Sequence, residues 1–259
     1  MPAYEQPRSD QQRVSFLKRT AAVGKTDEVV ITTSPGGATT TSGEVYVSAG
    51  TLAAIDAFLP SFTLAFETVT GSQSLRSREV AERVAAIDEV QTYSRDLMEG
   101  AKRRIYRMKL PAAVLEFYQM QLDGSVPNPT TQDDWLTLSD RIVAGDAQAV
   151  AAGYAAMSNP SAAELAAIIA AAREEATEAD AADRVYDQAQ AAVAALRARA
   201  DELITDVVEE IRFATRKQDA ASQRRILRTY GAQFRYLPGE APDEPAAPDQ
   251  EPALVAVAA

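Results

Sequence analysis

Residues 186–207 read YDQAQAAVAALRARADELITDV. Apolar side chains recur in this stretch at steps of three and four, at Tyr186, Ala189, Val193, Leu196, Ala200, Leu203 and Val207. This spacing places them on one side of a helix, while Arg, Asp and Glu flank them. The pattern is typical of a seam through which a helix packs along a second helix, with coiled-coil character.

The same helix is predicted to extend well beyond this seam. Residues 161–217 contain neither proline nor glycine, and Ser161 followed by Glu164 is a helix-start signal. At 1.5 Å per residue, an unbroken helix over this range would be roughly 85 Å long. Such a length predicts an elongated fold built from long antiparallel helices.

A second long helical segment is predicted between Leu75 and Leu110. Its apolar positions, with the polar Gln91 and Ser94 admitted to the seam, are Val84, Ile87, Met98, Ala101, Ile105 and Met108. A short helix is predicted to precede it and to end near Pro60, because proline disrupts a helix interior.

Shorter helices are predicted between the two long ones. Pro111 is expected to begin one that reaches Met120, since proline is tolerated in the first helical turn. Thr131, with Asp134 three residues later, resembles a cap for the next helix, which Gly145 is expected to end.

Strand signals are confined to the two ends of the chain. Val29–Thr33 and Glu44–Ser48 are β-branched runs that flank a Ser-Pro-Gly-Gly turn, so they predict a β-hairpin. Residues 232–238, AQFRYLP, predict a last strand that pairs with this hairpin.

The predicted fold class is mainly α, an elongated antiparallel helical bundle or coiled-coil-like hairpin with a small N-terminal β-hairpin. Four segments are expected along the chain, because its composition changes at their boundaries. They are a disordered arm (1–12), a small β-containing element (13–50), the helical bundle (51–237) and an acidic, Pro-rich disordered tail (238–259).

Composition excludes several kinds of chemistry. The 259 residues include no cysteine and no histidine, which excludes thiolate or imidazole metal sites and Ser-His or Cys-His catalysis. The net charge is −11, which argues against non-specific binding of nucleic acid by the whole chain. Without an apolar leader or an uninterrupted apolar run of membrane-spanning length, the sequence predicts a cytoplasmic protein with no membrane span.

Two basic clusters stand out in this acidic chain, over residues 102–109 and 212–228. Both lie toward helix C-termini, where cations interact favourably with the helix dipole. Pairing with acidic faces of the same or a neighbouring subunit is a second interpretation, and an anionic partner is a third. The residues named as partner-binding candidates are Arg103, Arg104, Arg107, Arg224, Arg225, Arg228 and Tyr230.

Acidic residues supply the other candidates. Glu202, Asp206 and Glu209 share one helix face and could hold a divalent cation or act as an acid/base pair. Like the preceding run that includes Glu174, Glu175 and Glu178, they are interpreted as a solvated face. The sequence therefore assigns no catalytic, cofactor-binding or metal-binding residue.

A phosphate-binding loop is suggested only by Gly24-Lys25-Thr26. The motif requires a glycine where this chain has Arg19, and a preceding strand, so the resemblance fails.

These observations lead to three functional hypotheses. The first is a non-enzymatic structural or scaffolding protein that forms a homo-oligomer or joins a larger assembly through its long helices. The alternatives are a nucleic-acid-binding module that uses the two arginine clusters, and a carboxylate- and metal-dependent enzyme. The terminal ALVAVAA, after a flexible acidic linker, suggests docking of the C-terminal tail on another chain.

Overall fold

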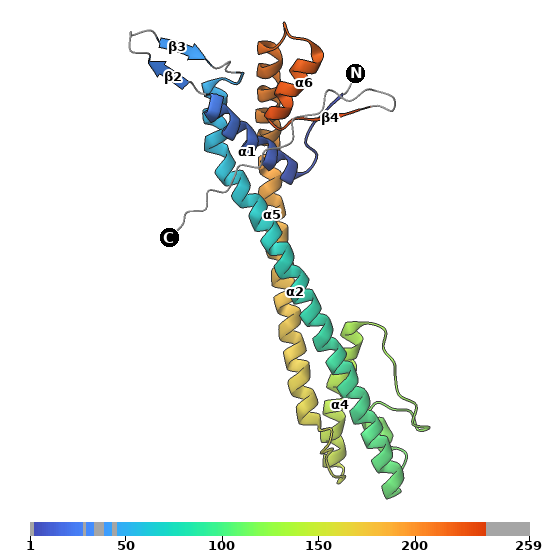
Figure 1. The fold of residues 1–259 in the computed structure, drawn as a ribbon. Helices are drawn as coiled ribbons and strands as arrows, with labels where there is room; N and C mark the ends of the chain where they lie inside the picture. Colours follow the sequence, from blue (N-terminus) through green and yellow to red (C-terminus); the bar gives the residue numbers. More distant parts are fainter. Residues whose placement is uncertain (1–2, 28–29, 34–38, 43–45, 237–259) are drawn as a thin grey trace, which may run out of the picture. The chain divides into compact units, whose positions relative to one another are not determined.

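The computed structural model describes residues 3–27, 30–33, 39–42 and 46–236. Within these ranges the helices are α1 (Asp10–Asp27), α2 (Ala49–Met108), α3 (Val114–Phe117), α4 (Gln132–Ala151), α5 (Ala162–Ala214) and α6 (Ala220–Thr229). The strands are β1 (Ala3–Glu5), β2 (Val30–Thr33), β3 (Thr39–Ser42) and β4 (Gln233–Arg235). The prediction of a mainly α fold is confirmed (Figure 1).

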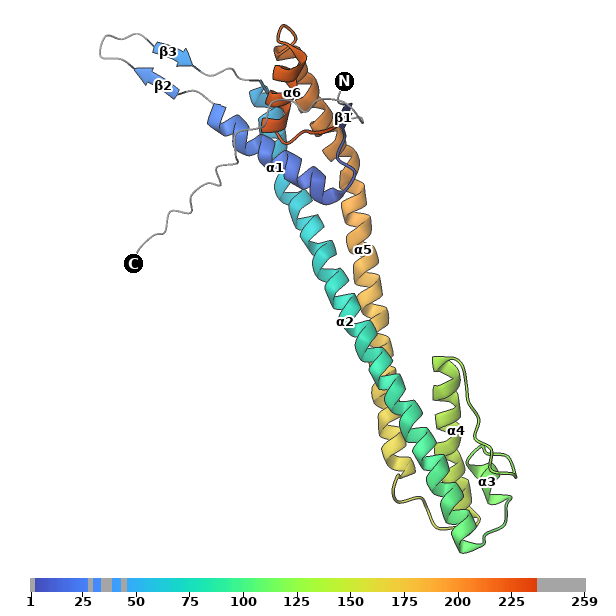
Figure 2. The ribbon, with the colours of Figure 1, turned by 45° about the vertical axis from the view of Figure 1, so that its right-hand side comes forward.

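The chain forms two compact units. Unit 1 combines residues 1–67 with residues 191–259, and unit 2 consists of residues 68–190. Helices α2 and α5 contribute to both units, and within each unit they run antiparallel beside one another (Figure 2). This division differs from the predicted segments 13–50 and 51–237, because the start of the chain packs with its end.

The seam predicted on α5 is largely buried. Ala189, Val193, Ala200, Leu203 and Val207 are at most 5% exposed. Tyr186 and Leu196 are half-buried. Since the long helix also begins and ends within three residues of the predicted limits, the three-and-four spacing was a sound guide to this element.

The seam predicted on α2 is correct in its centre and wrong at its edges. Ile87, Met98, Ala101 and Ile105 are buried, as is Ser94. The two predicted end positions are exposed instead, Val84 by 44% and Met108 by 59%. Val90 and Leu97, which are fully buried, belong to the core, so the contact surface is shifted around the helix.

Two predicted helix ends do not exist. Helix α2 continues through Pro60. Proline has no backbone N–H, so the carbonyl four residues earlier loses its helical hydrogen bond. Because this part of the helix surface is exposed, that carbonyl can bond to water instead. Helix α4 continues through Gly145, which is buried against the backbone of Phe117. In α4 the glycine therefore permits close packing and does not serve as a stop.

The segment after α2 is less helical than predicted. Only Val114–Phe117 of the expected Pro111–Met120 helix is helical. Asp146 lies inside α4. Its buried carboxylate Oδ1 accepts hydrogen bonds from the hydroxyl of Tyr118 at 2.7 Å and the backbone N–H of Met157 at 3.1 Å.

Capping chemistry at the other helix ends follows the sequence. The hydroxyl of Thr131 accepts from the backbone N–H of Asp134 at 3.1 Å and caps α4. Ser161 and Glu164 form the reciprocal capping box at the start of α5. Gly231, with a φ of 98°, follows α6 in the left-handed conformation that favours glycine.

The strands differ from prediction in their position along the chain and in their pairing partners. β2 pairs antiparallel with β3, but β3 lies at 39–42, earlier than the predicted Glu44–Ser48. β4 pairs with β1, with Tyr4 opposite Phe234, and not with the hairpin. Residues 3–5 and the start of α1 are therefore structured where a disordered arm was predicted.

Gly145 and Gly71 offer a matched test of helix packing in unit 2. A Cβ at Gly145 would lie 1.6 Å from the carbonyl oxygen of Phe117, whereas a Cβ at Gly71 would meet nothing within 4 Å. We expect Gly145→Ala to lower the free energy of unfolding by about 2–4 kcal/mol, because α3 and α4 must move apart. Gly71→Ala should raise it by about 0.5–1 kcal/mol through helix propensity.

Urea unfolding of the full chain, followed by circular dichroism, measures both changes. Equal effects of the two substitutions would contradict the close contact at Gly145.

Candidate functional site

The two basic clusters belong to different units. Arg103 and Arg107, in unit 2, are exposed, while Arg104 Nη1 donates to the carbonyl of Ala156 at 2.9 Å. In unit 1, Arg225 Nη2 donates to the hydroxyl of Ser222 at 3.2 Å. Half-buried Arg224 also makes an interaction. The structure thus gives no reason to treat the clusters as one continuous basic surface.

Arg228 and Tyr230 are taken up by packing within unit 1. The guanidinium of Arg228 lies over the ring of Phe234, 5.2 Å from its centroid, and also donates to the Tyr236 hydroxyl. Tyr230 is 2% exposed, and its ring packs edge-on against Tyr46 at 6.5 Å. The ring of Tyr230 is therefore not at the surface, where a stacking contact with a nucleobase would require it.

The Gly24-Lys25-Thr26 motif lies inside α1. Gly24 lets α1 approach the side chain of Leu52, which a Cβ would meet at 2.4 Å. Lys25 Nζ pairs with Asp56 at 3.0 Å. The first two residues of the motif thus join α1 to α2.

A four-residue ion-pair network, which the sequence analysis missed, joins α1 to α5. Arg13 Nε and Nη2 donate to the two carboxylate oxygens of Asp201 at 2.8 and 3.1 Å. Arg197 binds both oxygens of Asp10 in the same bidentate way, at 2.9 and 2.8 Å. The spacing of Arg197 and Asp201 would suggest a pair within one helix, but each binds across to α1.

Glu210 anchors the start of α2. Its Oε2 accepts from the backbone N–H of Ser48 at 2.6 Å, and its Oε1 accepts from the hydroxyls of Ser48 and Thr51. A carboxylate at a helix N-terminus also interacts favourably with the helix dipole. The acidic face of α5 therefore includes residues with structural roles.

The predicted carboxylate set on α5 is not a cluster. Glu202, Asp206 and Glu209 are exposed, and Glu202 pairs with Arg199 at 2.5 Å. Within the described residues, these three do not form a group of carboxylates close enough to share a metal ion.

A different carboxylate group does come together, in unit 2. One oxygen each of Glu79, Glu175 and Glu178 lies within 4.8 Å of the others. Burial, followed by the charges of neighbouring carboxylates, raises the pKa of Glu175 above its ordinary value. From the sequence, Glu175 and Glu178 were interpreted only as part of a solvated acidic run. Glu79 could not be paired with them, because their contact depends on the register between α2 and α5.

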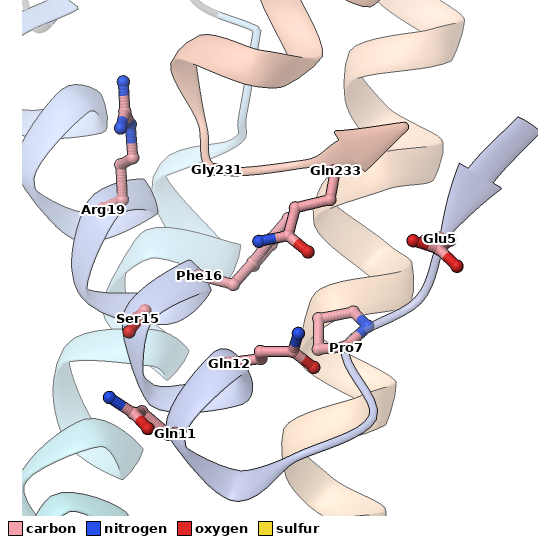
Figure 3. Close-up of a pocket in the computed structure, with 9 residues that line it drawn as sticks. All are labelled: Glu5, Pro7, Gln11, Gln12, Ser15, Phe16, Arg19, Gly231 and Gln233. Atoms are coloured by element: carbon pink, nitrogen blue, oxygen red, sulfur yellow. The ribbon is translucent and has the colours of Figure 1, made fainter. Parts of the chain in front are cut away.

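A small cavity of about 290 Å³ opens between α1 and the β1–β4 pair (Figure 3). Gln12 lies beside Pro7, and Gln233 lies next to Phe16. Apart from Glu5 and Arg19 its lining is uncharged, and Arg19 Nε already donates to the carbonyl of Thr229 at 2.8 Å. Amide groups such as those of Gln12 and Gln233 can both donate hydrogen bonds to a polar ligand and accept them from it.

The most apolar part of α2 is poorly covered. Residues 49–66 contain one charged side chain, Asp56, and only Leu52, Ile55 and Phe62 among them are buried. Five exposed residues, spaced by four, four, three and four, define the α2 apolar face: Ala49, Ala53, Ala57, Pro60 and Leu64. Among the described residues, α2 is the one helix whose length and composition would also suit a membrane crossing.

No protein-family model, curated protein or solved structure matches the chain. Function must therefore be argued from the two units themselves.

The α1–α5 network yields a matched pair of variants. Asp201→Asn removes the closer of the two carboxylates that face the largely buried Arg13 guanidinium and leaves Asp10, 3.5 Å from its Nη1, so we expect the free energy of unfolding to fall by about 1–2 kcal/mol. Asp206→Asn, on the exposed face of the same helix, should change it by less than about 0.5 kcal/mol. Urea unfolding of the full chain measures both, and equal losses would show that Asp201 has no special role.

Proposed function

We propose that the protein is a non-enzymatic structural subunit that self-associates through the α2 apolar face. The observation that carries the proposal is the exposure of this face: its five members lie on one side of α2, and Leu64 is 65% exposed. Exposed apolar surface of this kind is stabilised when another apolar surface covers it.

The spacing of the face suits a helix as the covering element. Steps of three and four keep its residues in line along α2, as in the contact surface of a coiled coil. The side chains are small apart from Leu64, so a second helix could approach closely and gain many van der Waals contacts.

Charge favours a second copy of the chain as the occupant. Two copies that each carry a net charge of −11 repel one another, so they should meet where the surface is uncharged. Asp56, the one charged side chain among residues 49–66, is paired with Lys25 of the same chain, and the exposed Glu67 follows Leu64 at the end of the face. A two-fold arrangement would place the same face of each copy against the other.

A lipid bilayer is the competing occupant of the α2 apolar face. A membrane-crossing helix presents apolar residues to lipid on most of its sides, whereas Leu52, Ile55 and Phe62 are already buried by the protein. This packing supports a helix partner on the remaining face.

A structural role is also supported by the polar groups described above. The Asp201 and Glu210 carboxylates hold α1 and α2 against α5, and the chain has no histidine or cysteine for catalysis. The predicted docking segment in the tail lies outside the described residues.

Ala57→Glu is the direct test of this proposal. A charge at the centre of the α2 apolar face should weaken self-association by more than about tenfold, because it would have to be buried without a partner. Ala195→Glu, an identical change at an exposed position of α5, should leave the association constant unchanged. Analytical ultracentrifugation over a range of concentrations measures the native mass of each variant.

A monomeric wild-type chain at every concentration tested would contradict the proposal, as would equal association of Ala57→Glu. Co-flotation of the wild-type chain with lipid vesicles, lost in Ala57→Glu, would assign the face to a membrane instead.

A further inference from the structure

The carboxylate group of unit 2 sits at the packing surface between α2 and α5. Glu79 lies on α2, seven residues after buried Ser72, and is itself 5% exposed. Glu175 and Glu178 are three residues apart on α5, so they project from the same side of that helix. A carboxylate in a buried seam position is costly unless its charge and its lone pairs are satisfied.

Two oxygens of this group are buried and have no hydrogen-bond partner among the described residues. Glu79 Oε1 accepts from Arg78 Nη2 at 2.5 Å, but Glu79 Oε2 is unpartnered. The Oε2 atom of Glu175 is likewise buried and unpartnered. Buried acceptors are nearly always bonded in folded proteins, so two orphans within one cluster point to a missing ligand.

The surrounding charges leave a negative excess at the cluster. Arg78 serves both Glu79 and the exposed Glu82, which lies 3.8 Å from its Nε. The nearby Arg83 donates both of its bonds to the side chain of Gln132 and lies 3.9 Å from Asp180. One guanidinium therefore faces three clustered carboxylates, and the missing ligand should be a cation.

The spacing and chemistry of the ligand atoms indicate which cation. Oxygens on opposite sides of Ca²⁺ are about 4.6–5.2 Å apart, since each bond is about 2.3–2.6 Å long. The three carboxylate oxygens lie within 4.8 Å of one another, which fits around one such ion. A set of oxygens alone favours Ca²⁺, Mg²⁺ or Mn²⁺ over the metals that select nitrogen or sulfur.

We propose that Glu79, Glu175 and Glu178 bind one divalent cation of the calcium type and so link α2 to α5 within unit 2. Ligands come from both helices, and the ion neutralises charge that would otherwise push these helices apart. Binding stabilises the folded chain in proportion to the ligand concentration.

Calcium titration of the full chain, first stripped with EDTA, tests the proposal. Isothermal calorimetry should show one Ca²⁺ per chain, and the melting temperature should rise with CaCl₂ but not with NaCl of equal ionic strength. Glu79→Gln should weaken Ca²⁺ binding by at least about tenfold, since even changes around the ligands of a metal site can cost that much.

Glu202→Gln, a change at an exposed carboxylate on the other part of α5, is the matched control and should bind Ca²⁺ as the wild type does. Circular dichroism checks that each variant remains helical, and native mass checks that self-association is unaffected. Absence of binding at millimolar Ca²⁺ would overturn the proposal. So would an equal loss in the control, which would indicate general charge screening.

Discussion

Packing between α2 and α5 is the interaction on which both units depend. The buried positions of α5 that face this packing are often alanine, as at Ala172, Ala179, Ala182, Ala189 and Ala200. Alanine lets helices approach closely but buries little apolar area per residue. Ion pairs, caps and bidentate arginine contacts therefore make up part of the stabilisation that a core of larger side chains would supply.

Polar groups within the packing limit which registers the helices can adopt. In unit 2, the hydroxyls of Ser94 on α2 and Ser139 on α4 bond to each other at 2.7 Å in a fully buried position. In unit 1, Glu210 meets the first turn of α2. A shift of one residue would break such contacts and leave buried polar atoms unbonded, whereas an all-alanine seam would tolerate it.

The spacing of apolar residues predicted helix packing well where a helix has one buried side. The α5 seam, the caps at Thr131 and Ser161 and the mainly α fold class all depend on residues close together in the chain. Pro60 and Gly145 were misread because their usual role as helix breakers was overridden by solvent exposure in one case and close packing in the other.

The candidate sites were harder to predict because they depend on contacts distant in sequence. Glu79 and Glu175 lie on different helices far apart in the sequence, and no local pattern predicts that they come together. Tyr230 lies near arginines in the sequence, but its ring packs against Tyr46 and its backbone carbonyl accepts a hydrogen bond from the hydroxyl of Thr20 on α1.

The β1–β4 pairing has a consequence for the order in which the protein can fold during synthesis. Unit 2 is one continuous stretch of chain, so all of its residues are available once residue 190 has left the ribosome. Unit 1 needs residues 233–235 to pair with residues 3–5. Domains generally fold as units as they emerge. The first part of this chain must therefore wait, with the buried α2 residues Leu52, Ile55 and Phe62 unprotected, until residues 233–235 have been made.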